Sequence, residues 1–287
     1  MKYVYYPGCS LKGTGKAYEE SLLAVCRALG MELEEIEDWN CCGATAYMSI
    51  DESKALALAG RNLALADHQK ADIVAPCSAC YLVLNKTQKT LKEYPDMRRR
   101  VDQALKTVGL TYRGNVKVRH PLDVLVNDIG LKTIAQKVVR PLRGIKFAPY
   151  YGCQIVRPYS TFDDQIRPVF MDKLLEALGA EVVSYPLKTR CCGGSLTGTL
   201  PEVGLRLAYI LIKEARKRGA DAIVTVCPLC QFNLDGYQDQ ISSKYEKVSM
   251  PILYFTQVLG WAMGLEAKPL GLKRSIVPAE PVLARGR

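Results

Sequence analysis

Apolar and polar positions follow two different periods along the first half of the chain, and the alternation predicts strands followed by helices. Residues 2–6 form a short β-branched and aromatic run that is typical of a strand, residues 31–36 are predicted as a second strand, and residues 71–75 as a buried third one. Residues 17–29 and 51–69 repeat apolar residues at helical spacing, and the second of these segments begins with acidic residues. With a loop before residue 51 and a helix after residue 75, the predicted order is strand, helix, strand, loop, helix, strand, helix.

The second half repeats this order of elements. A strand is predicted from residue 145, helices over 170–178 and 201–218, and strands over 181–185 and 222–226. Strands that alternate with helices predict an α/β fold, with a small parallel or mixed sheet flanked by helices in each half. The chain is therefore expected to hold two homologous, pseudo-symmetric domains.

The cysteines give the repeat its register. Each half reads C-x(31 or 37)-CCG-x33-CxxC, and a shift of 150 relates four positions without a gap. The first cysteine of each half shifts by 144 instead, from Cys9 to Cys153. The pairs related by 150 are Cys41 and Cys191, Cys42 and Cys192, Cys77 and Cys227, and Cys80 and Cys230.

The repeat and the positions of the prolines set the expected domain boundaries. We expect an N-terminal domain over 1–110, a connecting segment over 111–144 and a C-terminal domain over 145–265. Residues 266–287 carry three prolines among basic residues, so they are predicted to form an extended basic tail that could serve as a docking arm.

Composition and charge narrow the class of protein. The 287 residues are 48% hydrophobic and 24% charged, which is ordinary for a soluble globule. No export signal and no membrane span are recognisable, so the expected compartment is the cytoplasm, where clustered thiols bind metal more often than each other. The net charge of +10 is compatible with an anionic substrate, an acidic partner or nucleic acid. Lys and Arg are spread along the chain without an aromatic-interleaved stripe, which disfavours nucleic acid.

The predicted strand ends bring the thiols to one place. Because ligand sites gather at the carboxyl ends of parallel strands, the five cysteines of each half are expected to converge on one sheet edge. Thiolates select zinc, copper(I) or iron–sulfur clusters, and four suffice for zinc. A fifth thiol and the adjacent Cys-Cys pair favour a polynuclear iron–sulfur centre, with structural zinc as the alternative. Cys26 has no repeat partner and is predicted to be a small buried hydrophobe.

The doubled pattern resembles the cysteine-rich CCG domain family. Two copies, led by YYPGC and YYGCQIVRP, are similar to the HdrB family of heterodisulfide reductase subunits. The resemblance implies that each domain binds one noncubane [4Fe-4S] cluster through all five of its cysteines. The implied ligands are Cys9, Cys41, Cys42, Cys77 and Cys80 for the first cluster, and Cys153, Cys191, Cys192, Cys227 and Cys230 for the second.

The same resemblance implies a reaction and partners. A disulfide would be reduced to two thiols, and we hypothesise that it docks between the halves and receives one electron from each cluster. The methanogen enzymes act on the mixed disulfide of coenzymes M and B. Implied partners are the other two heterodisulfide reductase subunits, the flavin-bearing iron–sulfur HdrA and the ferredoxin-like HdrC, linked to hydrogenase or formate dehydrogenase for electron bifurcation. No flavin or nicotinamide site is expected in this chain, because its glycine-rich segments do not match those fingerprints.

Alternatives and supporting residues complete the predictions. The chain could act on another sulfur substrate, such as a protein-bound disulfide or persulfide, or belong to a lactate or quinone oxidoreductase as its CCG-domain component. It could also be a non-catalytic metal-binding scaffold. His68 and His120 are expected at the surface or in turns. Candidate substrate-binding cations are Lys12, Lys16, Arg157, Lys188 and Arg190, and candidate cluster-supporting glycines, whose amides could approach the sulfides, are Gly43, Gly193 and Gly194.

Overall fold

A computed structural model describes residues 1–44, 46–159 and 161–286. The chain forms two compact units, each drawn from two segments. The first unit holds Met1–Cys9 and Gly30–Pro121, and the second holds Ser10–Leu29 and Leu122–Arg287. This division differs from the predicted boundaries, because residues 10–29 join the second unit and the predicted connecting segment is divided at residue 121.

The first unit is built on a four-stranded parallel sheet. Its strands are β1 (Lys2–Tyr5), β2 (Glu32–Glu35), β3 (Ile73–Val74) and β4 (Val118–Arg119), in the order β2-β1-β3-β4. All three pairings are parallel. The first three strands were predicted from the sequence, whereas β4 falls in the segment expected to connect the domains.

The second unit repeats this sheet. It consists of β5 (Lys146–Tyr150), β6 (Glu181–Val182), β7 (Ala222–Thr225) and β8 (Ile252–Tyr254), in the order β6-β5-β7-β8. Its pairings are again parallel. The predicted fold class, two homologous α/β domains with small sheets flanked by helices, is confirmed.

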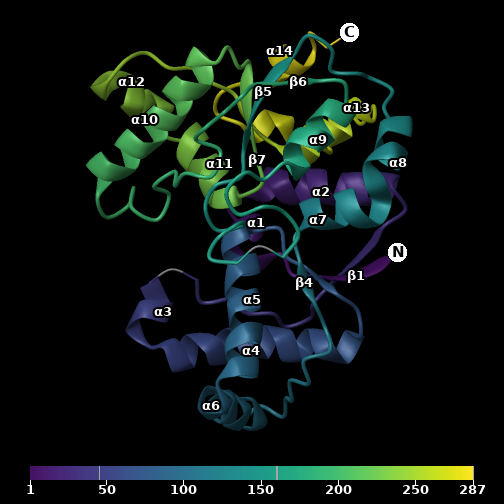
Figure 1. The fold of residues 1–287 in the computed structure, drawn as a ribbon, viewed down its shortest axis with the longest axis vertical. Helices are drawn as coiled ribbons and strands as arrows, with labels where there is room; N and C mark the ends of the chain where they lie inside the picture. Colours follow the sequence, from purple (N-terminus) through teal and green to yellow (C-terminus); the bar gives the residue numbers. More distant parts are fainter. Residues whose placement is uncertain (45, 160, 287) are drawn as a thin grey trace. The chain divides into compact units, whose positions relative to one another are not determined.

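Helices follow the strands as the alternation predicted. In the first unit these are α3 (Ala46–Ile50), α4 (Glu52–Gln69), α5 (Ser78–Glu93) and α6 (Pro95–Lys106), of which the last three pack against one another (Figure 1). Asp51 begins α4 by accepting a hydrogen bond from the Lys54 amide (3.0 Å), as its acidic start suggested.

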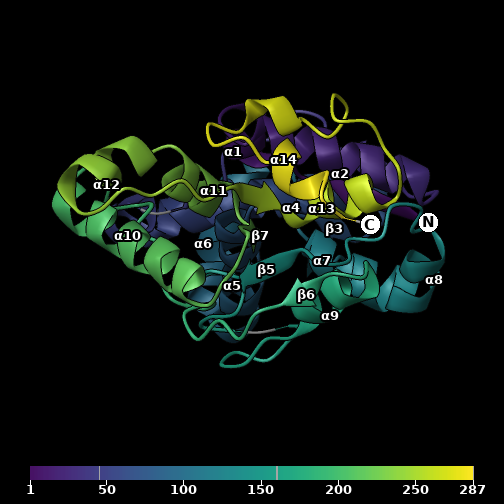
Figure 2. The ribbon, with the colours of Figure 1, turned by 90° about the horizontal axis from the view of Figure 1, so that it is seen from above.

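The second unit carries helices on both faces of its sheet. These are α9 (Phe170–Ala177), α10 (Pro201–Lys217), α11 (Pro228–Asp235), α12 (Gln238–Lys244) and α13 (Phe255–Ala262). Figures 1 and 2 show α10, α11 and α12 on one side of β5 and β7, and α9 and α13 on the other. Two-sided coverage buries the strands, and every residue of β7 is buried.

Helix α2 explains why residues 10–29 belong to the second unit. The chain passes through α1 (Gly8–Lys12) into α2 (Lys16–Ala28), which packs along α13 (Figure 2). The Ser21 and Thr256 hydroxyls lie 2.7 Å apart, and the rings of Tyr18 and Tyr254 stack with centroids 4.5 Å apart. An apolar face indicates that a helix has a packing partner but does not identify it, so the packing of α2 on α13 was not predicted.

The residues that follow the first repeat also belong to the second unit. Beyond β4 lie α7 (Pro121–Val124), the π-helical turn η1 (Leu125–Gly130) and α8 (Leu131–Gln136), and α8 packs on α9. The expectation for His120, just before α7, was wrong. Its side chain is fully buried, and its Nε2 lies 2.9 Å from the Pro76 carbonyl oxygen.

The prediction of an extended tail over 266–287 was also wrong for the residues described. The segment forms a 3-10 turn, η2 (Leu272–Arg274), and a short helix, α14 (Glu280–Leu283), and it buries Leu270 and Leu283. Asp235 accepts hydrogen bonds from the amides of residues 276 and 277, at 2.8 and 3.0 Å. Pro269 lies in a turn and Pro281 in the first turn of α14, within a packed segment.

Candidate metal centres

In the first unit, the cysteines follow the carboxyl ends of three adjacent strands. Cys9 comes four residues after β1, the Cys41-Cys42 pair follows β2, and Cys77 and Cys80 open α5 after β3. The Sγ atoms of Cys42 and Cys80 lie 3.4 Å apart. Their nearness confirms that parallel strands direct these distant cysteines to one sheet edge.

The second unit repeats this geometry. Cys153 follows β5, the Cys191-Cys192 pair follows the loop after β6, and Cys227 and Cys230 follow β7. The Sγ atoms of Cys192 and Cys230 lie 3.5 Å apart, close to the distance between their counterparts in the first unit. Each unit therefore gathers its cysteines at one edge of its own sheet.

Exposure divides each set of five thiols in the same way. Three cysteines of each set are buried, while the first cysteine and the leading member of the Cys-Cys pair are more accessible. The buried three are Cys42, Cys77 and Cys80 in one unit and Cys192, Cys227 and Cys230 in the other. Cys9, Cys41 and Cys191 are exposed, and Cys153 is intermediate. Each site thus has a buried floor and an accessible side.

The thiols interact strongly enough to change one another's acidity. Hydrogen bonds from the Cys41 and Cys80 thiols lower the pKa of Cys42, and a hydrogen bond from the Cys153 thiol lowers the pKa of Cys191. The same contacts raise the pKa of the donors Cys41, Cys80 and Cys153, and burial adds to the effect. Metal binding to such a set would release protons, because thiolates are the ligating form.

Backbone amides also reach the sulfurs. The amides of Gly193 and Gly194 donate to the Sγ atoms of Cys191 and Cys192, both at 3.3 Å. Gly43 and Gly193 have φ values of +74° and +81°, in the left-handed region that glycine adopts at little energetic cost. The Gly193 and Gly194 amides stabilise negative charge on the cysteine sulfurs.

Two tyrosines that the sequence did not single out hold the Cys-Cys segments. The Tyr6 hydroxyl donates to the Asn40 carbonyl (2.8 Å), and the Tyr150 hydroxyl donates to the Arg190 carbonyl (2.7 Å). Both side chains are fully buried. Burial and the neighbouring cysteines raise the pKa of each phenol, so both remain donors. The repeat itself offered the signal, since the shift of 144 that relates the first cysteines also relates these tyrosines.

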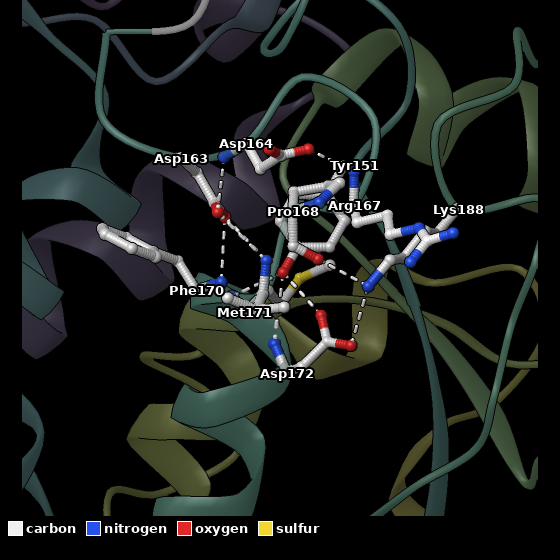
Figure 3. A network of polar contacts seen from close by, with 10 residues as sticks. Tyr151, Asp163, Asp164, Arg167, Pro168, Phe170, Met171, Asp172 and Lys188 are labelled. Atoms are coloured by element: carbon white, nitrogen blue, oxygen red, sulfur yellow. Dashed lines mark hydrogen bonds and ion pairs between the residues drawn. The ribbon is translucent and has the colours of Figure 1, made fainter.

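A partly buried network connects the loops around the second site (Figure 3). The Tyr151 hydroxyl donates to Asp172 Oδ2 (2.6 Å), and Lys188 Nζ donates to Asp172 Oδ1 (3.0 Å). The Lys188 carbonyl accepts from the amides of Tyr151 and Gly152, at 2.8 and 3.1 Å. Lys188 thereby joins the segment before Cys153 to the segment before Cys191, and its charge is neutralised by Asp172.

The other candidate cations differ in their surroundings. Lys12 and Lys16 both pair with the buried carboxylate of Glu19, at 2.6 Å each. Burial opposes ionisation of Glu19, but the two lysines lower its pKa overall. Arg157 and Arg190 are exposed, and the Arg157 guanidinium donates to the Thr189 carbonyl. Arg190 directly precedes Cys191, and Arg157 lies four residues after Cys153.

The donor set fits an iron–sulfur cluster. Each unit supplies five soft sulfur donors, and in the second unit amide hydrogen bonds reach the sulfurs. Glycine makes room beside the sulfurs, because a Cβ added to Gly8 would lie 2.8 Å from Cys80 Sγ. Within the described part of the chain, no three His, Cys, Asp or Glu side chains are grouped as ligands of a single metal ion. Cys26 lies buried in α2, where burial raises its pKa to about 12.

Comparison with known families agrees with the repeat. Residues 3–85 and 147–235 match the family model described as the CCG cysteine-rich domain, so both copies are recognised. The chain belongs to the CCG cysteine-rich domain family, and within it to the members that resemble HdrB of heterodisulfide reductases.

Three relatives match nearly the whole chain. The 8-methylmenaquinol:fumarate reductase membrane anchor subunit of Wolinella succinogenes is 32% identical, covering 97% of this chain and 98% of its own length. A heterodisulfide reductase HdrB-like protein of Archaeoglobus profundus is 31% identical (99% and 98%). The HdrB subunit of the ferredoxin:CoB-CoM heterodisulfide reductase of Methanosarcina mazei is 29% identical (99% and 96%). The names of these relatives refer to oxidoreductases.

A solved structure shares the fold. A hypothetical protein from Helicobacter pylori superposes with a TM-score of 0.80 at 15% identity, over 97% of this chain and 52% of that one. This chain therefore spans about half of that structure. None of the helices in the described residues is both long and apolar enough to cross a bilayer.

Proposed function

We propose that this chain is the disulfide-reducing subunit of a heterodisulfide reductase-like complex. A disulfide, two electrons and two protons yield two thiols, and the electrons come from partner subunits. Each unit would hold one noncubane [4Fe-4S] cluster through its five cysteines, and each cluster, when bound, supplies one of the two electrons. The observation that carries this proposal is the pair of converging five-cysteine sets in a chain similar to HdrB proteins.

The accessible side of each site supports the proposal. Buried thiols anchor the inner face, and the exposure of Cys9, Cys41 and Cys191 leaves the outer face open to a substrate sulfur. The amides of Gly193 and Gly194 stabilise sulfur charge at the second site. The phenols of Tyr6 and Tyr150 are kept as donors to the segments that carry the thiols.

Partners and compartment follow from the same proposal. We propose HdrA-type and HdrC-type proteins as electron suppliers, with hydrogenase or formate dehydrogenase behind them for electron bifurcation. The relative from Methanosarcina mazei is named for ferredoxin and for the CoB-CoM heterodisulfide, which makes such a mixed disulfide the first substrate to test. We propose the cytoplasm as the compartment, because clustered cysteines bind metal more often than each other where thiols are kept reduced.

A second candidate function is favoured by the Wolinella succinogenes relative. Its name places it in an 8-methylmenaquinol:fumarate reductase. In that case, the two clusters of this chain would pass electrons within a quinone oxidoreductase. Disulfide reduction by the purified chain with an artificial reductant supports the first candidate, and oxidation of a menaquinol analogue by its native complex supports the second.

The decisive measurement is the metal content of anaerobically purified protein. We expect about eight irons and eight sulfides per chain, as two four-iron clusters require, and a paramagnetic resonance signal that changes when thiols are added. About one or two zinc ions per chain with little iron would contradict the proposal.

Arg157 is proposed to attract anionic groups of the disulfide. It is exposed four residues after Cys153, and opposite charge raises the local concentration of a substrate. Arg157→Ala is expected to raise KM for an anionic disulfide about 5- to 10-fold with little change in kcat, an effect that weakens as salt increases. Lys213→Ala, an exposed change on α10, serves as the control. An unchanged KM would remove Arg157 from the substrate site.

A further inference from the structure

Two equivalent hydrogen bonds connect the sheets to the segments that carry the metal ligands. In each repeat, a buried tyrosine at the end of the first strand donates its phenol to the carbonyl immediately before the Cys-Cys pair. The donors Tyr6 and Tyr150 are related by the shift of 144, and the acceptors Asn40 and Arg190 are related by the shift of 150. Although donors and acceptors are related by different shifts, the same hydrogen bond forms in both repeats, with lengths of 2.8 and 2.7 Å.

The donor and the acceptor of this hydrogen bond lie in different kinds of backbone. Tyr150 lies in β5 opposite Thr225 of β7, and the Tyr6 amide donates to Val74 of β3 (3.0 Å), so each ring stands on a paired strand. The Cys-Cys pairs lie in segments without helix or strand. A fixed donor at the base of an irregular segment limits where the next residue can lie.

The other polar contacts on these segments differ between the repeats. In the first unit, the Asn62 side chain of α4 accepts a hydrogen bond from the Asn40 amide (3.0 Å) and donates one to the Asn40 carbonyl (2.9 Å). In the second unit Asn233 of α11 holds the Cys192 carbonyl instead (2.7 Å). The tyrosine contact is thus common to both repeats although the surrounding scaffold differs.

We propose that Tyr6 and Tyr150 are positioning residues for the two metal centres. Each phenol fixes the carbonyl before the accessible thiol, Cys41 or Cys191, and so sets the distance of that thiol from the buried three. This inference rests on the proposed function insofar as the thiols bind clusters. Neither tyrosine touches the substrate in this scheme. Each acts through the backbone.

Phenylalanine variants with a matched control test the proposal. Tyr6→Phe and Tyr150→Phe each remove one buried phenol-to-carbonyl bond. Tyr185→Phe removes the same kind of bond from the same core, but the Tyr185 hydroxyl donates to the Leu211 carbonyl of α10 (2.9 Å) and not to a Cys-Cys segment. We expect all three variants to lose thermal stability to a similar extent. Only Tyr6→Phe and Tyr150→Phe should release iron to a chelator about 10-fold faster than wild type and change the paramagnetic resonance spectrum.

The outcomes separate this inference from the proposed function. If Tyr6→Phe and Tyr150→Phe match Tyr185→Phe in iron release and in spectrum, the positioning role is wrong, whereas the proposal that the cysteines bind clusters is unaffected. If the wild-type chain holds no iron, the proposed function fails, and alkylation of the exposed Cys41 and Cys191 thiols still decides the inference. Faster alkylation of Cys41 in Tyr6→Phe and of Cys191 in Tyr150→Phe supports it, and rates equal to those of Tyr185→Phe overturn it.

Discussion

Replacing Cys192 with alanine is expected to empty the second metal centre and stop disulfide reduction. Cys192 is buried, and its sulfur lies 3.5 Å from that of Cys230. Iron should fall from about eight to about four per chain, because the first unit keeps its own five thiols. Turnover should fall more than about 100-fold, beyond the loss typical of changes around a metal ligand, since one of the two electrons then has no source.

The repeat supplies the reciprocal experiment and Cys26 supplies the control. Cys42→Ala should remove the other half of the iron and leave the spectrum of the second centre, a result that would mean the two sites fill independently. Cys26→Ala removes an equally buried thiol from α2, outside both sites. It should keep the full iron content and turnover at a modest cost in stability. Full iron and turnover in Cys192→Ala would show that the repeated cysteines are not the ligands.

The convergence of the thiols could be predicted because it depends on local signals. Strands were predicted over residues 2–6, 31–36 and 71–75, and a cysteine follows each of them. Strands that alternate with helices form parallel sheets, and their carboxyl ends share one edge. The structure agrees for these strands and for their counterparts in the second half.

The partners of α2 and of the tail could not be predicted in the same way. The apolar face of residues 17–29 predicts a buried helix, but it does not identify α13 as the element that covers it. Strand β4 has only two residues and lies in a stretch without a clear period. Prolines at 269, 278 and 281 indicate turns, whereas the burial of Leu270 and Leu283 depends on contacts distant in sequence.

Side-chain roles at the site were the hardest to predict. Lys12, Lys16 and Lys188 were candidates for substrate binding because of their charge and position. The structure pairs the first two with Glu19 and the third with Asp172. Sequence spacing indicates only the Lys16–Glu19 pair, whose members lie three residues apart on α2. The shift of 144 relates Tyr6 to Tyr150, but only the geometry of their hydroxyls shows which carbonyls they bind.

Adding one methyl group at Gly8 is expected to disable the first metal centre. Gly8 has φ +66°, and a Cβ built there would lie 2.8 Å from the Sγ atom of Cys80. Cys80 is 3% exposed at the start of α5, so its sulfur has little room to move away. Gly8→Ala should therefore lose about half of the iron, and with it the two-electron reaction.

Two further glycines separate the clash from backbone strain. Gly30 has φ +69° and no atom within 4 Å of an added Cβ, so Gly30→Ala should cost about 1–2 kcal/mol of stability and no iron. At Gly152 the added Cβ would lie 3.1 Å from Cys230 Sγ, so Gly152→Ala should weaken iron binding at the second site less than Gly8→Ala weakens it at the first. Iron analysis with thermal unfolding checks the order. If Gly8→Ala kept its iron and matched Gly30→Ala in stability, the space beside Cys80 would not be needed for the cluster, and the positioning of the buried thiols would have to be explained without it.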